Sequence, residues 1–467
     1  MACPGPTAVK LLPLRSLTLG IALVAPLVAG RPVRAQPAVD PPMRVLLQEG
    51  PALSVRGAGP GGLRLRDRQG RILQELGGDQ VLQLQLRGGW VEAVAMAPPA
   101  AAGVAKPAVV AGPELWIEPI ANADEASLWV QQRRYRGQLQ IRPQAESLQV
   151  VNVVPLETYL ASVVGSEMPA SWPLEALRAQ AVAARTYALR GRKPSAPFDL
   201  KATVASQMYR GVEAETDSTR AAVVGTRGLV LTYGTALIDA VFHSSSGGST
   251  ESSGDLWGQQ LPYLVSVPDF DDEAPVRQWR QTLDSLQLLK AFPETGGVSA
   301  IDVVATTPTG RVRQARVVGP LGQLLLSGAQ LRSRLGLKST WVRFELQPLP
   351  ATSAASAAAM AQGWVGAAGL NPPQPPAMAP LPPPVAPPVQ AASPVQPAPA
   401  VQLVAVGRGF GHGIGMSQWG AYALARRGQG YAQILQHYYR GTQLRPYSTL
   451  AGEALALAPG VAPGARP

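Results

Sequence analysis

Cysteine is almost absent from this chain of 467 residues, which contains only Cys3. A disulfide needs two cysteines, so this chain forms none from its own residues, and a mature chain without Cys3 has no thiolate metal site. Because Cys3 lies in a predicted leader, we also expect the mature chain to have no thiol nucleophile.

Long apolar runs are scarce as well. The N-terminal run at 17–30 is shorter than the ~18–20 residues that a membrane span needs. It follows the basic residues Lys10 and Arg15, and small residues precede a possible cleavage site after Ala35. We expect residues 1–35 to be a signal peptide and the protein to be exported to the periplasm or cell wall. An uncleaved signal, acting as a membrane anchor, is the alternative.

Acidic residues are outnumbered by basic ones, which gives a formal net charge of +11. A basic exported protein can bind an anionic cell wall, a membrane surface or nucleic acid. The sequence has no long Lys/Arg run and no alternation of aromatic and basic residues of the kind that single-strand binders use. We therefore expect no nucleic-acid partner, and membrane contact only through an uncleaved signal.

Short alternating segments separated by Gly-rich turns predict strands in the first third of the chain. These segments are 44–49, 62–67, 81–87, 115–119 and 137–143. The first four predict a small β-rich region over residues 36–130, and we expect the last, within 135–154, to belong to the next domain. The following residues predict an α+β fold, a mixed catalytic domain with several short helices and antiparallel strands.

Helical and strand patterns alternate in that second region. The predicted helices are 156–164, ended by Gly165, one that starts at Pro173, 219–225, 286–292, 418–427 with Ser417 as N-cap, and 431–439. The predicted strands are a hairpin of 228–234 with 236–246, then 300–305, 312–318, 340–346 and 401–406.

Residues 349–400 consist mostly of Ala and Pro. Such a segment cannot bury a core, so we expect a disordered or extended insertion between two strands of one domain. The α+β domain would then comprise 131–348 and 401–446, followed by a flexible tail at 447–467.

The sharpest candidate for chemistry is Glu167, in a turn flanked by Met168 and Trp172. Partial burial there would raise the pKa of its carboxyl and keep it protonated, as a general acid requires. On the turn alone, Glu167 as a cap or as an ion-pair partner of a nearby arginine remains an alternative. Arg178 and Arg185 follow seven residues apart on one helical face. We expect that face to approach whatever covers the Glu167 turn; an ordinary solvated helix face is the alternative.

Two further blocks carry polar groups. Residues 242–248 place His243, Ser244 and Ser245 before a Gly turn, without the G-x-S-x-G elbow of many serine hydrolases. In residues 407–425, alternating glycines leave one side of the backbone bare, for a flat ligand or another chain segment. That block presents His412, Ser417 and Gln418.

Taken in order, these three blocks resemble the stage II sporulation protein D family, also called the SpoIID/LytB or amidase-enhancer family. The resemblance rests on SEMP, on EALRAQAVAARTYAL and on GRGFGHGIGMSQWGAYALA, and it covers roughly 134–444 without the insertion. Arg178 stands where lysine is common. Some relatives have a Cys/His zinc site before Gln-x-Tyr-x-Gly, but DLKATVASQMYRG lacks such ligands, so we predict no structural metal and no cofactor.

The resemblance implies a lytic transglycosylase that cleaves MurNAc–GlcNAc bonds of peptidoglycan glycan strands, with Glu167 as its single acid/base. It also implies a set of residues that bind substrate: Arg178, Gln180, Arg185, Gln207, Tyr209, His243, Ser244, Ser245, His412, Ser417 and Gln418. One alternative is a non-catalytic wall-binding protein that enhances a separate N-acetylmuramoyl-L-alanine amidase. The other is a peptidoglycan hydrolase that uses His243 and a serine.

Overall fold

A computed structural model describes residues 40–59, 61–96, 109–120, 126–348 and 401–450, together with residues 1, 2 and 5. The chain divides into two units, 1–37 and 38–467, and every element below belongs to the second. The predicted signal peptide is almost wholly outside the described residues, as are the Ala/Pro-rich insertion and residues 451–467. Within the described ranges, no helix is long and apolar enough to cross a membrane.

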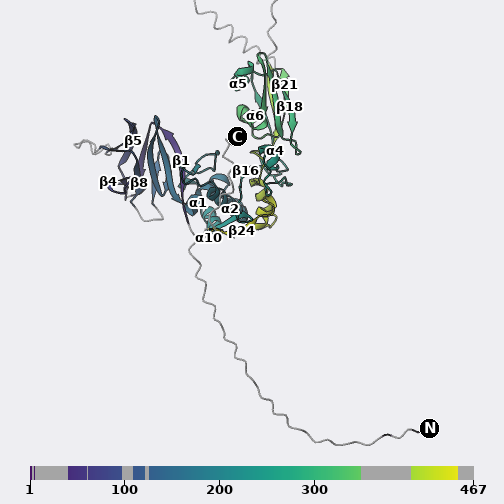
Figure 1. Ribbon diagram of the computed structural model, residues 1–467, viewed down its shortest axis with the longest axis horizontal. Coiled ribbons are helices and arrows are strands. Elements are labelled where there is room, and N and C mark those ends of the chain that lie inside the picture. Colours follow the sequence, from purple (N-terminus) through teal and green to yellow (C-terminus); the bar gives the residue numbers. More distant parts are fainter. Residues whose placement is uncertain are drawn as a thin grey trace, which may run out of the picture. The chain divides into compact units, whose positions relative to one another are not determined.

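Strands dominate the first part of the chain, drawn in purple and blue in Figure 1. Their bounds are β1 (Pro42–Gly50), β2 (Ala52–Gly57), β3 (Leu63–Asp67), β4 (Ile72–Leu76), β5 (Val81–Arg87), β6 (Trp90–Met96), β7 (Val109–Gly112), β8 (Leu115–Pro119), β9 (Ser127–Val130), β10 (Arg133–Arg136), β11 (Gln138–Gln144) and β12 (Ser147–Pro155). With β13 (Leu200–Lys201), they form two sheets, ordered β13-β1-β12-β11-β8-β3-β4 and β10-β9-β2-β5-β6-β7. The five predicted strands are confirmed, whereas the sequence analysis did not predict β2 and β6 or the short β4, β7, β9 and β10.

Each sheet buries one face, because apolar and polar residues alternate along its strands. In β5, Leu82 and Leu84 are buried while Gln83 and Gln85 are exposed. The buried faces of both sheets contribute to one apolar cluster, which also includes residues of the helices that follow. β1 pairs with β12 from Pro42↔Pro155 to Gly50↔Leu148, so strands on either side of residue 130 share a sheet. The domain boundary at that residue stays a prediction.

The helices that follow pack on this cluster. They are α1 (Leu156–Glu167), α2 (Leu174–Arg190) and α3 (Asp217–Val224). The predicted end of α1 at Gly165 is wrong, because the helix continues to Glu167. A Cβ at Gly165 would lie 1.9 Å from the Ala214 carbonyl oxygen, so this glycine permits close packing and does not end the helix. Pro173 is the N-cap of α2, and the small side chains of α2 are largely buried.

The predicted hairpin at 228–246 forms only in part. β14 (Leu229–Tyr233) pairs with β15 (Ala236–Leu237) and also with β24 (Gln443–Pro446). β16 (Phe242–His243) instead pairs in parallel with β23 (Met416–Ser417). This long-range pairing joins the second and third sequence blocks. The helices after it are α8 (Gln418–Arg426), α9 (Tyr431–Tyr438) and α10 (Tyr447–Leu450).

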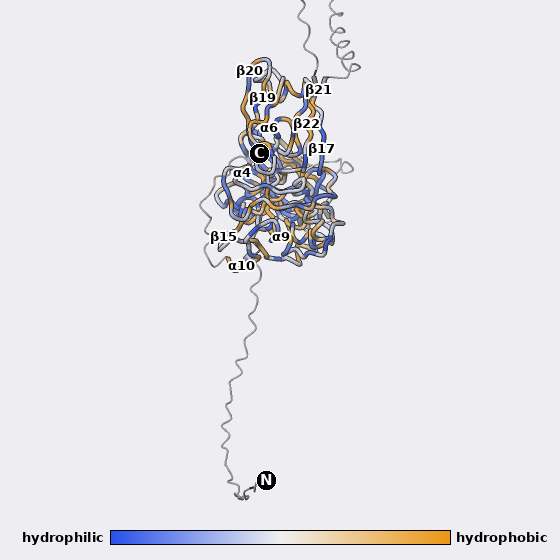
Figure 2. Tube along the Cα trace, turned by 90° about the vertical axis from the view of Figure 1, so that its right-hand side faces the viewer, coloured by the Kyte–Doolittle hydropathy of each residue, from blue (hydrophilic) through white to orange (hydrophobic). Residues whose placement is uncertain are grey.

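A second apolar cluster lies in residues 276–344 and 403–405. Its elements are β17 (Gln278–Leu283), α5 (Ser285–Ala291), β18 (Ala300–Thr306), β19 (Val312–Gly319), β20 (Gly322–Ser327), α6 (Gly328–Leu335), β21 (Val342–Pro348) and β22 (Val401–Arg408). Hydrophobic and hydrophilic residues are interspersed along these strands (Figure 2). β21 pairs with β22 from Val342↔Gly407 to Pro348↔Val401, so residues 349–400 connect two neighbouring antiparallel strands. Mixed helices and antiparallel sheets confirm the predicted α+β class.

Candidate functional site

Glu167 is the last residue of α1 and is half-buried. The preceding residue, Ser166, fixes this end of the helix. Its Oγ donates to the Ser162 carbonyl at 2.7 Å. The same Oγ accepts the backbone N–H of Arg210 at 3.1 Å. The end of α1 is thereby attached to the segment 207–210.

Both carboxylate oxygens of Glu167 accept a hydrogen bond. The Met208 N–H donates to Oε1 at 2.8 Å, and Gln418 Nε2 donates to Oε2 at 3.2 Å. Burial raises the pKa of Glu167, while these two hydrogen bonds and the nearby Arg210 charge offset part of that rise. The carboxyl is therefore held in one orientation and stays protonated to a higher pH than a free glutamate. Of the predicted substrate residues, the structure brings Gln418 directly to Glu167.

Gln207 and Tyr209 do not lie on a surface, although the sequence analysis assigned them to substrate binding. Gln207 is fully buried, where it accepts the Tyr159 hydroxyl at 3.0 Å and donates to the Ala184 carbonyl at 3.2 Å. Tyr209 is also buried, and its hydroxyl donates to Asn152 at 2.8 Å. These anchors fix the backbone between them. We infer that they aim the Met208 N–H at Glu167.

Arg185 is also an interior residue, with none of its side chain exposed. Its guanidinium makes a bidentate ion pair with Glu157, at 2.8 Å from Nε and 2.7 Å from Nη2. Glu157 lies in the first turn of α1, ten residues and about 15 Å of helix from Glu167. The expectation that the arginine face covers the Glu167 turn is therefore wrong for Arg185.

Arg178 and Gln180 likewise turn away from a substrate surface. Arg178 Nη1 pairs with Glu175 at 2.6 Å, and its guanidinium lies against Gly225 at the end of α3. Gln180 is fully buried, and both atoms of its amide lack a partner among the described residues. The seven-residue spacing did place both arginines on one helical face, but this face packs against the 223–229 segment.

His243 is buried and neutral. Its Nδ1 lies 3.1 Å from the Ile414 carbonyl, and Nε2 has no partner among the described residues. Burial, followed by the charge of Arg311, lowers the pKa of His243 to about 3. The buried Ser245 Oγ also lacks a partner there. The hydrogen bond between base and nucleophile that defines a serine-hydrolase dyad is thus not formed.

His412 uses both ring nitrogens to hold the backbone. Nε2 donates to the Phe242 carbonyl at 3.0 Å, because Nδ1 accepts the Ile414 N–H at 3.1 Å and so fixes the tautomer. Ser417 caps α8 by accepting the Gly420 N–H at 3.2 Å, which confirms its predicted role as N-cap. The half-buried Ser244 accepts the Trp419 N–H at its carbonyl, at 3.0 Å. These contacts align the second and third blocks.

The alternating glycines approach other parts of the chain. A Cβ at Gly411 would lie 2.6 Å from the Cβ of His243, and one at Gly413 would lie 2.5 Å from Cζ of Arg311. Both glycines also have positive φ values, of 120° and 83°. Of the two alternatives, close approach by another chain segment is the one that the structure contains.

Three half-buried aromatic residues pack on one another, and one of them, Trp172, lies five residues after Glu167 in the sequence. Trp172 is 4.7 Å from Trp419 and 4.9 Å from Tyr422, measured between ring centroids. We call these three residues the aromatic cluster. Trp419 directly follows Gln418, whose amide contacts Glu167. The sequence analysis missed Trp419 and Tyr422, although their i, i+3 spacing on α8 puts them on one face. It also missed the exposed Arg210.

Comparison with known proteins gives a consistent set of matches. Residues 144–233 match the family model described as "SpoIID: Stage II sporulation protein". The chain is 30% identical over 312 residues to "Amidase enhancer" of Bacillus subtilis (strain 168), covering 62% of this chain but only 40% of that protein. It is 29% identical over 316 residues to "Stage II sporulation protein D" of the same organism, covering 63% of this chain and 76% of that protein. The protein of the same description from Bacillus amyloliquefaciens is 29% identical, over 66% of this chain and 78% of the relative.

Proposed function

We propose that this chain, whose residues 144–233 match the SpoIID family model, is an exported peptidoglycan-remodelling enzyme, a lytic transglycosylase that acts in the periplasm or cell wall. The matches to an amidase enhancer and to sporulation proteins support a role related to the cell wall. The finer activity rests on one observation, the half-buried Glu167 with both its oxygens held and its pKa raised.

In the proposed reaction, protonated Glu167 donates its proton to the glycosidic oxygen as the bond from that oxygen to C1 of MurNAc breaks. The resulting carboxylate then takes the proton of the C6 hydroxyl, whose oxygen forms a new bond to C1. The product is a 1,6-anhydro end, and no water is consumed. The Met208 N–H and Gln418 amide stabilise the carboxylate between the two steps, since both donate to it.

One acid is sufficient for this chemistry, whereas hydrolysing glycosidases ordinarily use a pair of carboxyl groups. The contacts of Glu167 agree with this, because its hydrogen-bond donors are an amide side chain and a backbone N–H, with a cation nearby. The aromatic cluster supplies half-buried rings, one of them on Trp419 directly after the Gln418 that contacts Glu167, and such rings are a suitable platform for the apolar face of a sugar.

The test is mass spectrometry of muropeptides after incubation of glycan strands, with and without stem peptides, with the chain lacking its predicted signal. We expect anhydro-muramic ends from wild type and none from Glu167→Gln. Glu273→Gln is the matched control, because Glu273 is half-exposed and, among the described residues, forms its ion pair with Arg426 at the surface. Equal product from Glu167→Gln and Glu273→Gln would refute the assignment.

A second candidate is favoured by the relative described as "Amidase enhancer". In this function the chain binds wall strands and raises the rate of a separate N-acetylmuramoyl-L-alanine amidase. Amidase activity on purified wall, measured with and without the chain, separates the two. Stimulation that Glu167→Gln retains in full, with no anhydro ends from wild type, would favour the enhancer.

A further inference from the structure

The six-stranded sheet carries a row of stacked side chains that the proposed reaction does not use. Arg56 on β2 and Arg134 on β10 both lie opposite Trp129 on β9 in the strand register. Cζ of Arg56 is 4.7 Å and Cζ of Arg134 is 5.4 Å from the centroid of the Trp129 ring. Their chain neighbours Val55 and Leu128 are buried, so these three residues occupy the opposite, outer face. We call them the Arg–Trp–Arg row.

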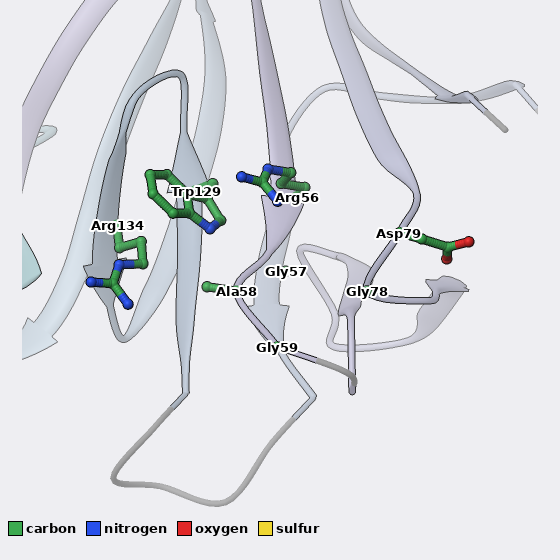
Figure 3. A pocket seen from close by; sticks show the side chains of 8 residues that line it. All are labelled: Arg56, Gly57, Ala58, Gly59, Gly78, Asp79, Trp129 and Arg134. Carbon is green, nitrogen blue, oxygen red and sulfur yellow. The ribbon is translucent and has the colours of Figure 1, made fainter. Parts of the chain in front are cut away.

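The row lines a shallow pocket of about 550 Å³. Figure 3 shows Trp129 between the two arginines, with the turn from Gly57 to Gly59 below them. Gly78 and the exposed Asp79 form another part of the lining. A Cβ at Gly59 would meet nothing within 4 Å, so a ligand can approach that turn closely, whereas the space beside Gly57 is filled by the backbone of Gly62. The open shape suits one stretch of a polymer.

The two arginines of the row are positioned to bind an anion. Stacking on an aromatic ring holds a guanidinium in place while its in-plane N–H groups remain available. Arg134 Nε already donates to Glu213 at 2.9 Å. Arg56 is exposed, and its guanidinium stacks on the Trp129 ring. It has no ion pair with any described carboxylate, so its charge is available to a ligand. A planar guanidinium fork matches a carboxylate through two parallel hydrogen bonds.

We propose that the Arg–Trp–Arg row is a second glycan-binding site, which takes a carboxylate-bearing saccharide. Arg56 binds the carboxylate, and Asp79 at the rim accepts hydrogen bonds from sugar hydroxyls. The identity of the saccharide as a wall glycan rests on the proposed function. The site would hold the chain on a strand while the Glu167 site reacts elsewhere.

Calorimetry of the full chain with soluble glycan strands tests this site. The strands are freed of stem peptides, so that their lactyl carboxylates are free, and a second batch has those carboxylates amidated. All proteins carry Glu167→Gln, so that the ligand is not consumed. We expect Arg56→Gln to lower affinity for carboxylate strands about tenfold, or ~1.4 kcal/mol. The parent should bind amidated strands as weakly as Arg56→Gln binds native ones.

Arg87→Gln is the matched control, because Arg87 is a highly exposed arginine on the same sheet that has no stack on Trp129. It should leave affinity unchanged. Arg56→Lys keeps the charge but loses the planar fork, so it should lose most of the affinity. An equal loss in Arg87→Gln, full retention in Arg56→Gln or Arg56→Lys, or tighter binding of a glycerol-phosphate polymer would each overturn the proposal.

The two proposals fail separately. With Glu167 intact, Arg56→Gln should still release anhydro ends from short soluble strands, because it does not touch the acid. Binding that depends on Arg56 in a chain that makes no anhydro ends would retain this site and refute the transglycosylase. Anhydro ends together with unchanged binding in Arg56→Gln would do the reverse.

Discussion

Replacing Glu157 by Gln distinguishes a structural Arg185 from a substrate-binding one. The Arg185 side chain is fully buried, and among the described residues its carboxylate partner is Glu157, which is 11% exposed and bonded through both oxygens. In Glu157→Gln the guanidinium stays buried with its charge uncompensated, and the new amide N–H faces one of its donors. Removing one partner of a buried pair typically costs about 3–5 kcal/mol. We expect a melting temperature lower by on the order of 10 °C.

Glu273→Gln is the control for this measurement too. It removes the same charge from a surface pair with Arg426, both about half exposed, where an ion pair contributes about 0–1 kcal/mol. Thermal unfolding by circular dichroism compares the two variants. If Glu157→Gln has the same melting temperature as Glu273→Gln but binds glycan strands more weakly, the structural account of Arg185 is refuted. The double variant Glu157→Leu, Arg185→Met should recover part of the loss, because it leaves no unpaired charge.

Three further predictions concern Glu167, His243 and a comparison of Gly413 with Gly258, which follows α4 (Ser253–Trp257) in a left-handed conformation with open space where a Cβ would lie. At neutral pH, Glu167→Gln should unfold at an equal or higher urea concentration than wild type, because it removes a buried charge. This difference should vanish as the pH falls below the raised pKa of Glu167, because the wild-type carboxyl is then protonated and uncharged as well. Gly258→Ala should lower the free energy of unfolding by about 1–2 kcal/mol, because of its positive φ alone. Gly413→Ala should lower it by about 1–3 kcal/mol more, because the new Cβ would also clash with Arg311. Urea unfolding midpoints measure both effects. Wild type should lose stability as the pH falls from about 6.5 toward 3, because only the unfolded chain protonates His243; His243→Asn should flatten that dependence, and an unchanged slope would contradict the prediction.

Local patterns were sufficient for much of the fold. The alternation of β5 and the N-cap at Ser417 are set by neighbouring residues, and both agree with the structure. The departure of β16 from its expected hairpin was not visible, because its partner β23 lies more than 170 residues later in the chain. Gly165 was misread because a glycine that permits close packing looks the same in the sequence as one that ends a helix.

In the candidate site too, the sequence predicted some features and only the structure revealed others. Glu167 was found from its turn and its resemblance, and the structure adds the two donors that hold it. One donor is the Met208 backbone N–H, a group that every residue except proline has, so no residue type signals it. Gln207 and Tyr209 were assigned to substrate binding, but both are buried, and residue type alone did not show that they face inward.

The most direct test of the central claim is the origin of the oxygen at the new glycan ends. Glycan strands incubated with the chain in ¹⁸O-labelled water are analysed by mass spectrometry. Attack by the C6 hydroxyl predicts anhydro-muramic ends without ¹⁸O, and none from Glu167→Gln. Reducing ends that contain ¹⁸O, or anhydro ends that persist in Glu167→Gln, would contradict the account.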